Sequence, residues 1–168
     1  MRRLLLLVVA GVLTSQPAIA DHIGLYSESS GASCALAPGF TSTAAVIQKF
    51  NSSGATGLRF RVDLSGAPGS SIFSFNTAYA AIGTVTDDLA VSYGSCLTGS
   101  IVVGTLTAAL NNGQINIRPA SSMQSIIYTD CSFGENSASG GRASVGGGDC
   151  NPNGADTATW GEIKSLYR

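Results

Sequence analysis

Histidine is almost absent from this 168-residue sequence, which contains a single one, His22. A Ser-His-Asp or Cys-His catalytic arrangement needs an imidazole that is held inside a pocket. His22 stands near the expected start of the mature chain, where a terminus tends to fray, so such hydrolytic mechanisms are excluded. The free amine of Asp21 together with His22 could bind Cu(II); an ordinary polar residue that opens an edge strand is the alternative.

Charged side chains are also scarce, at 11% of the residues, and basic ones do not predominate. Without Arg2-Arg3, seven basic side chains stand against ten acidic ones, a net charge of about −3. Nucleic acids and anionic membranes attract basic surfaces, so neither is expected as a partner. Helix-forming residues are few, and Gly, Ser, Thr, Ala and Asn take their place, which favours strands joined by tight turns.

The first twenty residues have the three parts of a secretory signal peptide. Arg2-Arg3 form the positive region, Leu4 to Leu13 the apolar region, and Ala18-Ile19-Ala20 the small-x-small cleavage site. We therefore expect residues 1–20 to be removed, with no membrane insertion after cleavage. The mature protein is expected to be secreted or periplasmic.

Four cysteines remain after cleavage, and an even number in an exported chain predicts two disulfides. They are Cys34, Cys96, Cys131 and Cys150. Of the three connectivities, we predict Cys34–Cys96 and Cys131–Cys150, because the second pair would hold the glycine-rich loop between its cysteines. A zinc site would need a C-x-x-C type of spacing, which the sequence lacks.

Short runs with strand character recur along residues 21–131 and are separated by turn residues, as in a sandwich or barrel. In the clearest run, Leu58–Leu64, apolar side chains alternate with Arg59, Arg61 and Asp63, so one face is buried and the other wet. The other predicted strands are His22–Tyr26, Thr43–Phe50, Ile72–Phe75, Ala78–Ile82, Leu89–Tyr93, Ser100–Leu110, Gln114–Arg118 and Ile126–Thr129.

One local pairing is predicted from turn chemistry. Asn111-Asn112-Gly113 separates Ser100–Leu110 from Gln114–Arg118, and Asn-Gly suits a primed hairpin turn because both residues tolerate positive φ. The fold class predicted for residues 21–131 is therefore all-β, an antiparallel β-sandwich of the jelly-roll or immunoglobulin-like type.

From 132 to 156 the composition shifts to Gly, Ser, Asn and Asp, with only Phe133 and Val145 to bury. We predict a poorly regular segment pinned by its disulfide. Within it, Asp149, Asn151 and Asn153 match the first half of a calcium loop, D-x-N-x-N-G, although Trp160 replaces the glutamate expected at the twelfth position. Calcium is one interpretation and a structural turn is the other; no other cofactor is expected.

The end of the chain, residues 157–168, is predicted to be a short helical tail. Trp160, Ile163 and Tyr167 fall on one side at helical spacing. Together with Leu166 they could bind a partner, because a chain end that carries the only tryptophan offers an anchor. The alternative is a helix that packs back on the sandwich.

Two resemblances add to this interpretation. Residues 56–64, TGLRFRVDL, and 99–107, GSIVVGTLT, resemble strands of cohesin-like domains, over roughly residues 40–120. Those domains are jelly-roll β-sandwiches that bind other proteins without catalytic residues, although they are not usually built around two disulfides. The ending TWGEIKSLYR, residues 159–168, is similar to that of some uncharacterised exported bacterial proteins, which implies a sorting or docking signal.

The function expected first is a secreted, non-enzymatic binding or structural protein of the bacterial envelope, with a protein partner. A carbohydrate-binding module is the alternative, and it needs aromatic side chains on one exposed face. The only set that could form such a face is Tyr79, Tyr93 and Tyr128.

A carboxylate-dependent hydrolase is the second alternative. It needs two acids that face one cleft at a separation of about 5–10 Å. The pairs considered are Asp63 with Asp130 or with Asp87. Because aspartates beside turn residues commonly bond their own backbone, we expect no enzyme and assign no catalytic residue.

Overall fold

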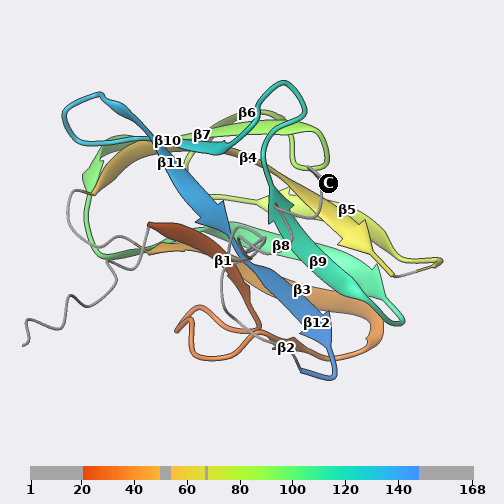
Figure 1. Cartoon of the computed structure of the whole chain (residues 1–168). Coiled ribbons are helices and arrows are strands. Elements are labelled where there is room, and N and C mark those ends of the chain that lie inside the picture. Colours follow the sequence, from red (N-terminus) through yellow and green to blue (C-terminus); the bar gives the residue numbers. More distant parts are fainter. Residues whose placement is uncertain (1–20, 50–53, 67, 148–168) are drawn as a thin grey trace, which may run out of the picture.

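The computed structural model describes residues 21–49, 54–66 and 68–147, which form twelve β-strands and no helix (Figure 1). The strands are β1 (His22–Tyr26), β2 (Ala35–Leu36), β3 (Gly39–Lys49), β4 (Ala55–Ser65), β5 (Ser71–Asn76), β6 (Ala80–Thr84), β7 (Asp88–Leu97), β8 (Ser100–Leu110), β9 (Gln114–Arg118), β10 (Ile126–Thr129), β11 (Glu135–Gly140) and β12 (Arg142–Val145). Within these ranges no helix is long and apolar enough to span a membrane. The predicted signal peptide, residues 1–20, and the predicted helical tail, residues 157–168, lie outside the described residues.

The all-β prediction is confirmed, and four predicted strands coincide with β1, β8, β9 and β10. The predicted run Leu58–Leu64 lies within β4, where the alternation is clearest: Leu58, Phe60 and Val62 are buried, and the intervening Arg59 and Arg61 are partly exposed. Successive side chains of a strand point to opposite faces, so one buried face requires this pattern.

Hydrogen bonds connect the twelve strands into a single mixed sheet. Its main path runs β2-β12-β9-β4-β10-β11-β1-β3-β8-β5, and β7 pairs with both β4 and β6. The predicted antiparallel pairing holds for most strands, but β1 pairs with β11 and β2 with β12 in parallel. Both parallel partners come from the glycine-rich segment, whose strands the sequence pattern did not indicate.

The sheet folds over so that two layers pack face to face (Figure 1). One layer contains β5, β8, β3 and β1, and the other contains β6, β7 and β4. Phe60 on β4 meets Phe75 on β5 edge to face, with ring centroids 6.1 Å apart. Tyr93 on β7 donates a hydrogen bond to the buried Gln48 on β3. Contacts between strands that do not pair show that the core lies between these layers.

The predicted hairpin is wrong, although the bounds of both its strands are right. β8 pairs with β3 and β5, whereas β9 pairs with β4 and β12. Both edges of each strand are therefore occupied by other partners, and the turn at 111–113 carries the chain between layers. Gly113 still supplies the positive φ that the turn needs, at 94°.

The glycine-rich segment is more regular than predicted, because Glu135–Gly140 and Arg142–Val145 are strands β11 and β12. Small residues here permit close packing of backbones. A Cβ on Gly140 would lie 2.3 Å from the carbonyl oxygen of Ile117, and one on Gly141 would lie 2.9 Å from the Cα of Gly24. The composition that suggested irregularity thus reflects tight strand packing.

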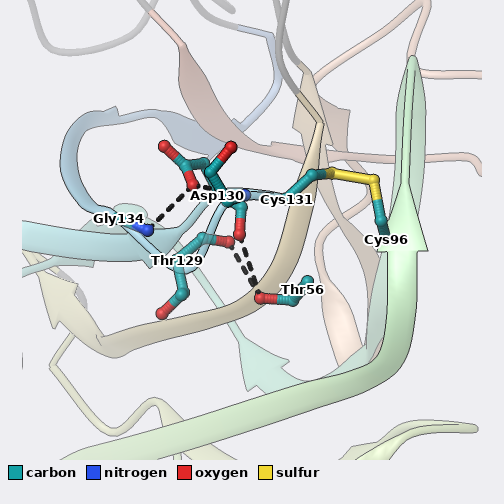
Figure 2. The surroundings of a disulfide bond; sticks show 7 residues. Thr56, Cys96, Thr129, Asp130, Cys131 and Gly134 are labelled. Carbon is teal, nitrogen blue, oxygen red and sulfur yellow. Dashed lines mark hydrogen bonds between the residues drawn. A yellow bond between two sulfur atoms is a disulfide. The ribbon is translucent and has the colours of Figure 1, made fainter.

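The predicted disulfide pairs Cys34–Cys96 and Cys131–Cys150 are wrong, because Cys96 is bonded to Cys131, with 5.1 Å between their Cα atoms (Figure 2). Cys96 lies near the end of β7 and Cys131 just after β10, and these two strands flank β4: Leu97 pairs with Ala55, and Thr129 pairs with Gly57. Their proximity therefore arises from non-local pairing. Cys34 is disulfide-bonded as well. Disulfides of this kind are typical of extracytoplasmic proteins.

Candidate functional site

The outer face of the layer that contains β6, β7, β4 and β10 carries two rows of side chains. Residues directly opposite each other in paired strands share a face of the sheet. The register places Ile82, Ala90, Arg59 and Ile127 in one row across the four strands. The adjacent row consists of Ala80, Ser92, Gly57 and Thr129.

These rows form the floor of a groove of about 560 Å³, which we call the apolar groove. Its floor is low because the two middle strands contribute Gly57, Ala90 and Ser92, whose side chains are absent or short. Larger side chains stand around it, and Ile82 and Phe133 are 81% and 79% exposed. Exposed apolar groups gathered at one hollow mark an interaction surface, whereas singly scattered ones do not.

Gly57 is required at the centre of this floor by close packing. A Cβ at this position would lie 2.9 Å from the carbonyl oxygen of Val91 on the neighbouring strand. Real Cβ atoms almost never come so near a backbone atom, so a larger residue would shift β4 against β7. The depth of the groove is therefore tied to a backbone contact.

A charged cluster lies at the side of the groove, and Arg59 is its member that lines the groove. Arg59 Nε donates a 2.7 Å hydrogen bond to Asp88 Oδ1, and its Nη2 donates to Asp88 Oδ2 and, at 3.0 Å, to Ser122 Oγ. Ser122 Oγ in turn donates to Asp88 Oδ2 at 2.9 Å. The hydrogen bonds from Arg59 lower the pKa of Asp88, so the carboxylate stays ionised and holds the guanidinium in place. The groove is thus apolar with one fixed ion pair at its side.

Phe133 lines the groove from a tight turn after β10. Asp130 Oδ1 accepts hydrogen bonds from the backbone N–H groups of Ser132, at 2.8 Å, and Gly134, at 2.9 Å. Phe133 has a φ of 65°, and a bulky residue in this left-handed region costs energy. The hydrogen bonds to Asp130 stabilise the turn in this conformation, and the ring lies in solvent rather than in the core, where the sequence pattern had placed it.

Acidification tests this turn. The backbone hydrogen bonds from Gly134 and Ser132, and that from Asn136, lower the pKa of Asp130. A carboxylate with a depressed pKa in the folded state contributes stability above its unfolded pKa and loses it as the pH falls through the folded pKa. We expect the amide proton resonances of Ser132 and Gly134 to shift together, with a midpoint below the ordinary pKa of an aspartate side chain. An NMR titration measures this; a midpoint above that value would contradict the turn.

The three tyrosines needed by the carbohydrate interpretation do not form an exposed platform. Tyr93 and Tyr128 are buried, and Tyr79 packs edge-on against Tyr93 with centroids 4.9 Å apart. Burial also raises the pKa of Tyr93 far above its ordinary value. Two of the three rings therefore belong to the core, which argues against a sugar-stacking surface made by this set.

Two of the three acids of the hydrolase interpretation, Asp63 and Asp130, make contacts within the fold. Thr56 Oγ1 on β4 donates to the carbonyl oxygen of Asp130 at 3.3 Å, and Asp63 lies seven residues further along the same strand. Seven residues of strand span roughly 23 Å, well beyond the separation that a glycosidase needs. Asp63 also accepts a 2.9 Å ion-paired hydrogen bond from Arg61. Asp63 and Asp130 therefore cannot act on one bond.

His22 is better held than a fraying terminus would allow. Its Nε2 lies 3.1 Å from the hydroxyl of Tyr26, and burial, followed by the charge of Lys49, lowers its pKa. β1 pairs with both β3 and β11, so the edge-strand prediction for His22 is wrong. No group of three metal-ligating side chains occurs in the described ranges. Asp149, Asn151 and Asn153, together with the predicted partner-binding residues Trp160, Ile163, Leu166 and Tyr167, lie outside them.

The arrangement of strands matches a known fold. It superposes on a cohesin module from a family 33 glycoside hydrolase of Clostridium perfringens with a TM-score of 0.55 and 6% identity, over 76% of this chain and 96% of that one. The fold is that of a cohesin module. A cohesin–dockerin complex is also similar, with a TM-score of 0.47 and 10% identity over 73% of this chain and 99% of that one. No protein-family model matches the sequence, and no curated protein matches it.

Sequence reasoning anticipated the cohesin-like fold but missed the groove. The residues that form it were read only as parts of separate strands, because the rows join positions up to 72 residues apart, as with Gly57 and Thr129. One local signal was present: the run Ala78–Ile82 has no polar face, yet β6 is exposed along its whole length. An apolar strand exposed on both faces at the edge of a sheet indicates a contact surface.

Proposed function

We propose that this protein is a non-catalytic protein-binding module of the bacterial envelope, and that the apolar groove is its contact surface. The observation that carries the proposal is the pair of exposed apolar side chains, Ile82 and Phe133, beside a floor of small residues. The centre of a protein interface is typically apolar and aromatic, with an arginine among its strongest contacts. Ile82, Phe133 and Arg59 provide this combination around one hollow.

The fold supports a binding role over catalysis. Cohesin-like domains, which residues 56–64 and 99–107 resemble in sequence, bind other proteins and contain no catalytic residues. Two of the acids that the hydrolase interpretation named, Asp130 and Asp63, are engaged in a turn and an ion pair. The tyrosines that a carbohydrate platform required are largely buried. A protein partner is therefore the ligand class that fits the exposed surface best.

Export supports the envelope as the place of action. The signal-peptide pattern of residues 1–20 and the Cys96–Cys131 disulfide both favour an oxidising compartment outside the cytoplasm. We propose that cleavage after Ala20 releases a mature chain that works in the periplasm or outside the cell. Its β-domain would display the groove, and residues 157–168 would form a separate functional element.

The test compares two single substitutions in the full-length mature protein. We expect Ile82→Asp to weaken capture of a partner from the envelope fraction by about 30-fold, the loss typical of a hot-spot contact. The matched control is Phe73→Asp, on β5, where an apolar side chain is 60% exposed outside the apolar groove. The proposed surface would be contradicted if both variants lost partner capture equally, or if neither variant lost it.

A further inference from the structure

We propose that the apolar groove is covered by the chain's own C-terminal segment, residues 157–168, until a protein partner displaces it. The inference rests on the proposed function in one respect, because it takes the groove as a surface that binds polypeptide. It adds the identity of an occupant and a means of regulation. The segment would act as an internal competitor for the same contacts.

The groove presents exposed apolar side chains that an occupant would cover. Ile82 and Phe133 are the two most exposed large hydrophobic residues among those that the structure describes, and both line it. A surface of this kind, left open, favours association or aggregation. A covering segment within the same chain prevents this while the protein awaits its partner.

The sequence of the segment is suited to such a groove. Trp160, Ile163 and Tyr167 recur at helical spacing, so a helix would present them as one apolar stripe. An amphipathic helix that lays its apolar face into a hydrophobic groove is a recurrent mode of peptide recognition. The stripe contains the only tryptophan of the chain, and tryptophan is enriched among residues that dominate binding energy.

The connecting chain is long enough to reach the groove. The described residues end at Gly147, and twelve residues lie between it and Trp160. The thirteen extended steps from Gly147 to Trp160 span at most roughly 45 Å. A domain of this size has a radius of gyration of about 14 Å, so the connecting chain is longer than twice that radius.

Charge also favours the match. Glu135 lines the groove, is exposed and forms no ion pair within the described part of the chain. The segment carries Lys164 and Arg168, and Glu162 is its only acidic residue. A bound helix could therefore place a basic side chain beside Glu135 while its apolar stripe faces Ile82 and Phe133.

The single tryptophan makes the proposal directly measurable. In the full-length mature protein we expect Trp160 fluorescence to be shifted to shorter wavelength, and to be less quenched by acrylamide, than in a free peptide of residues 157–168. Ile82→Asp should shift the emission toward that of the peptide. Phe73→Asp should leave it unchanged, and far-UV circular dichroism should show that both variants retain their strands.

Three outcomes would overturn the inference: emission equal to that of the free peptide, protection that Ile82→Asp leaves intact, and protection that appears only at concentrations where the protein dimerises. The last would make a second copy the occupant. Capture of a partner is read separately. If Trp160 is solvent-exposed while Ile82→Asp still abolishes capture, only this inference fails. If Ile82→Asp removes the protection of Trp160 but leaves partner capture unchanged, only the proposed function fails.

Competition between the C-terminal segment and the partner predicts the direction in which the segment changes partner capture. If the segment covers the groove, Trp160→Ala should strengthen partner capture, because the substitution removes the competitor and leaves the groove intact. A loss of capture in this variant would contradict internal competition and would place Trp160 in the contact with the partner instead.

Discussion

Replacing Phe60 with alanine is expected to lower the free energy of unfolding by about 3–5 kcal/mol, the cost of removing a fully buried aromatic ring and leaving a cavity. Phe60 lies on β4, the strand that pairs with β7, β9 and β10. Its ring is fully buried and meets Phe75 of the opposite layer edge to face. The substitution therefore weakens the contact between layers at the strand that also forms the floor of the groove.

Denaturant unfolding of the oxidised protein measures this loss, and Phe73→Ala is the matched control. Phe73 lies two residues before Phe75 on β5, but its side chain is 60% exposed. Surface substitutions of this kind usually change the free energy of unfolding by no more than about 0.5 kcal/mol. If Phe60→Ala costs as little as Phe73→Ala, the two layers do not pack through these rings.

The second large effect is expected from the double substitution Cys96→Ser and Cys131→Ser. The bond joins residues 35 apart in sequence, and closing a loop of that length stabilises the folded state by about 4 kcal/mol on the chain-entropy estimate. Both cysteines line the apolar groove. We therefore expect a lower free energy of unfolding. We also expect the turn that carries Phe133 to be less firmly fixed to β7, because the covalent link between them is lost.

Peptide mapping without reduction provides the control for this interpretation. It should yield a linked peptide that contains Cys96 and Cys131. Cys34 is also disulfide-bonded, so within one chain its expected partner is Cys150. Recovery of Cys34–Cys96 or Cys131–Cys150 as the main linkage would contradict the structure. Unfolding of the double variant at the same denaturant concentration as the parent would show that the bond is not stabilising.

Local pattern was a good guide to the strands and a poor guide to their partners. The bounds of β1, β8, β9 and β10 follow from alternation and turn residues, which depend on near neighbours in sequence. The partners of β8 and β9 depend on which strand edges are left free in three dimensions. Asn111-Asn112-Gly113 therefore marked a turn correctly but not the pairing across it.

The groove shows why a contact surface is harder to predict than a strand. Arg59, Ala90 and Ile127 come from three strands, and only the register of β4 with β7 and β10 aligns them. Phe133 was expected in the core because it is apolar, yet the hydrogen bonds of Asp130 hold its turn outside. The resemblance to cohesin-like strands predicted the fold correctly, but it did not place the surface.

The most direct test of the central claim, that the apolar groove is a protein-contact surface, is site-specific photo-crosslinking in the native envelope. A photoreactive phenylalanine analogue would replace Ile82 in one variant and Phe73 in the other. We expect position 82 to crosslink to polypeptide, either a partner or residues 157–168 of the same chain, identified by mass spectrometry. Position 73 should give no such product. Crosslinks from position 73 with none from position 82 would contradict the account.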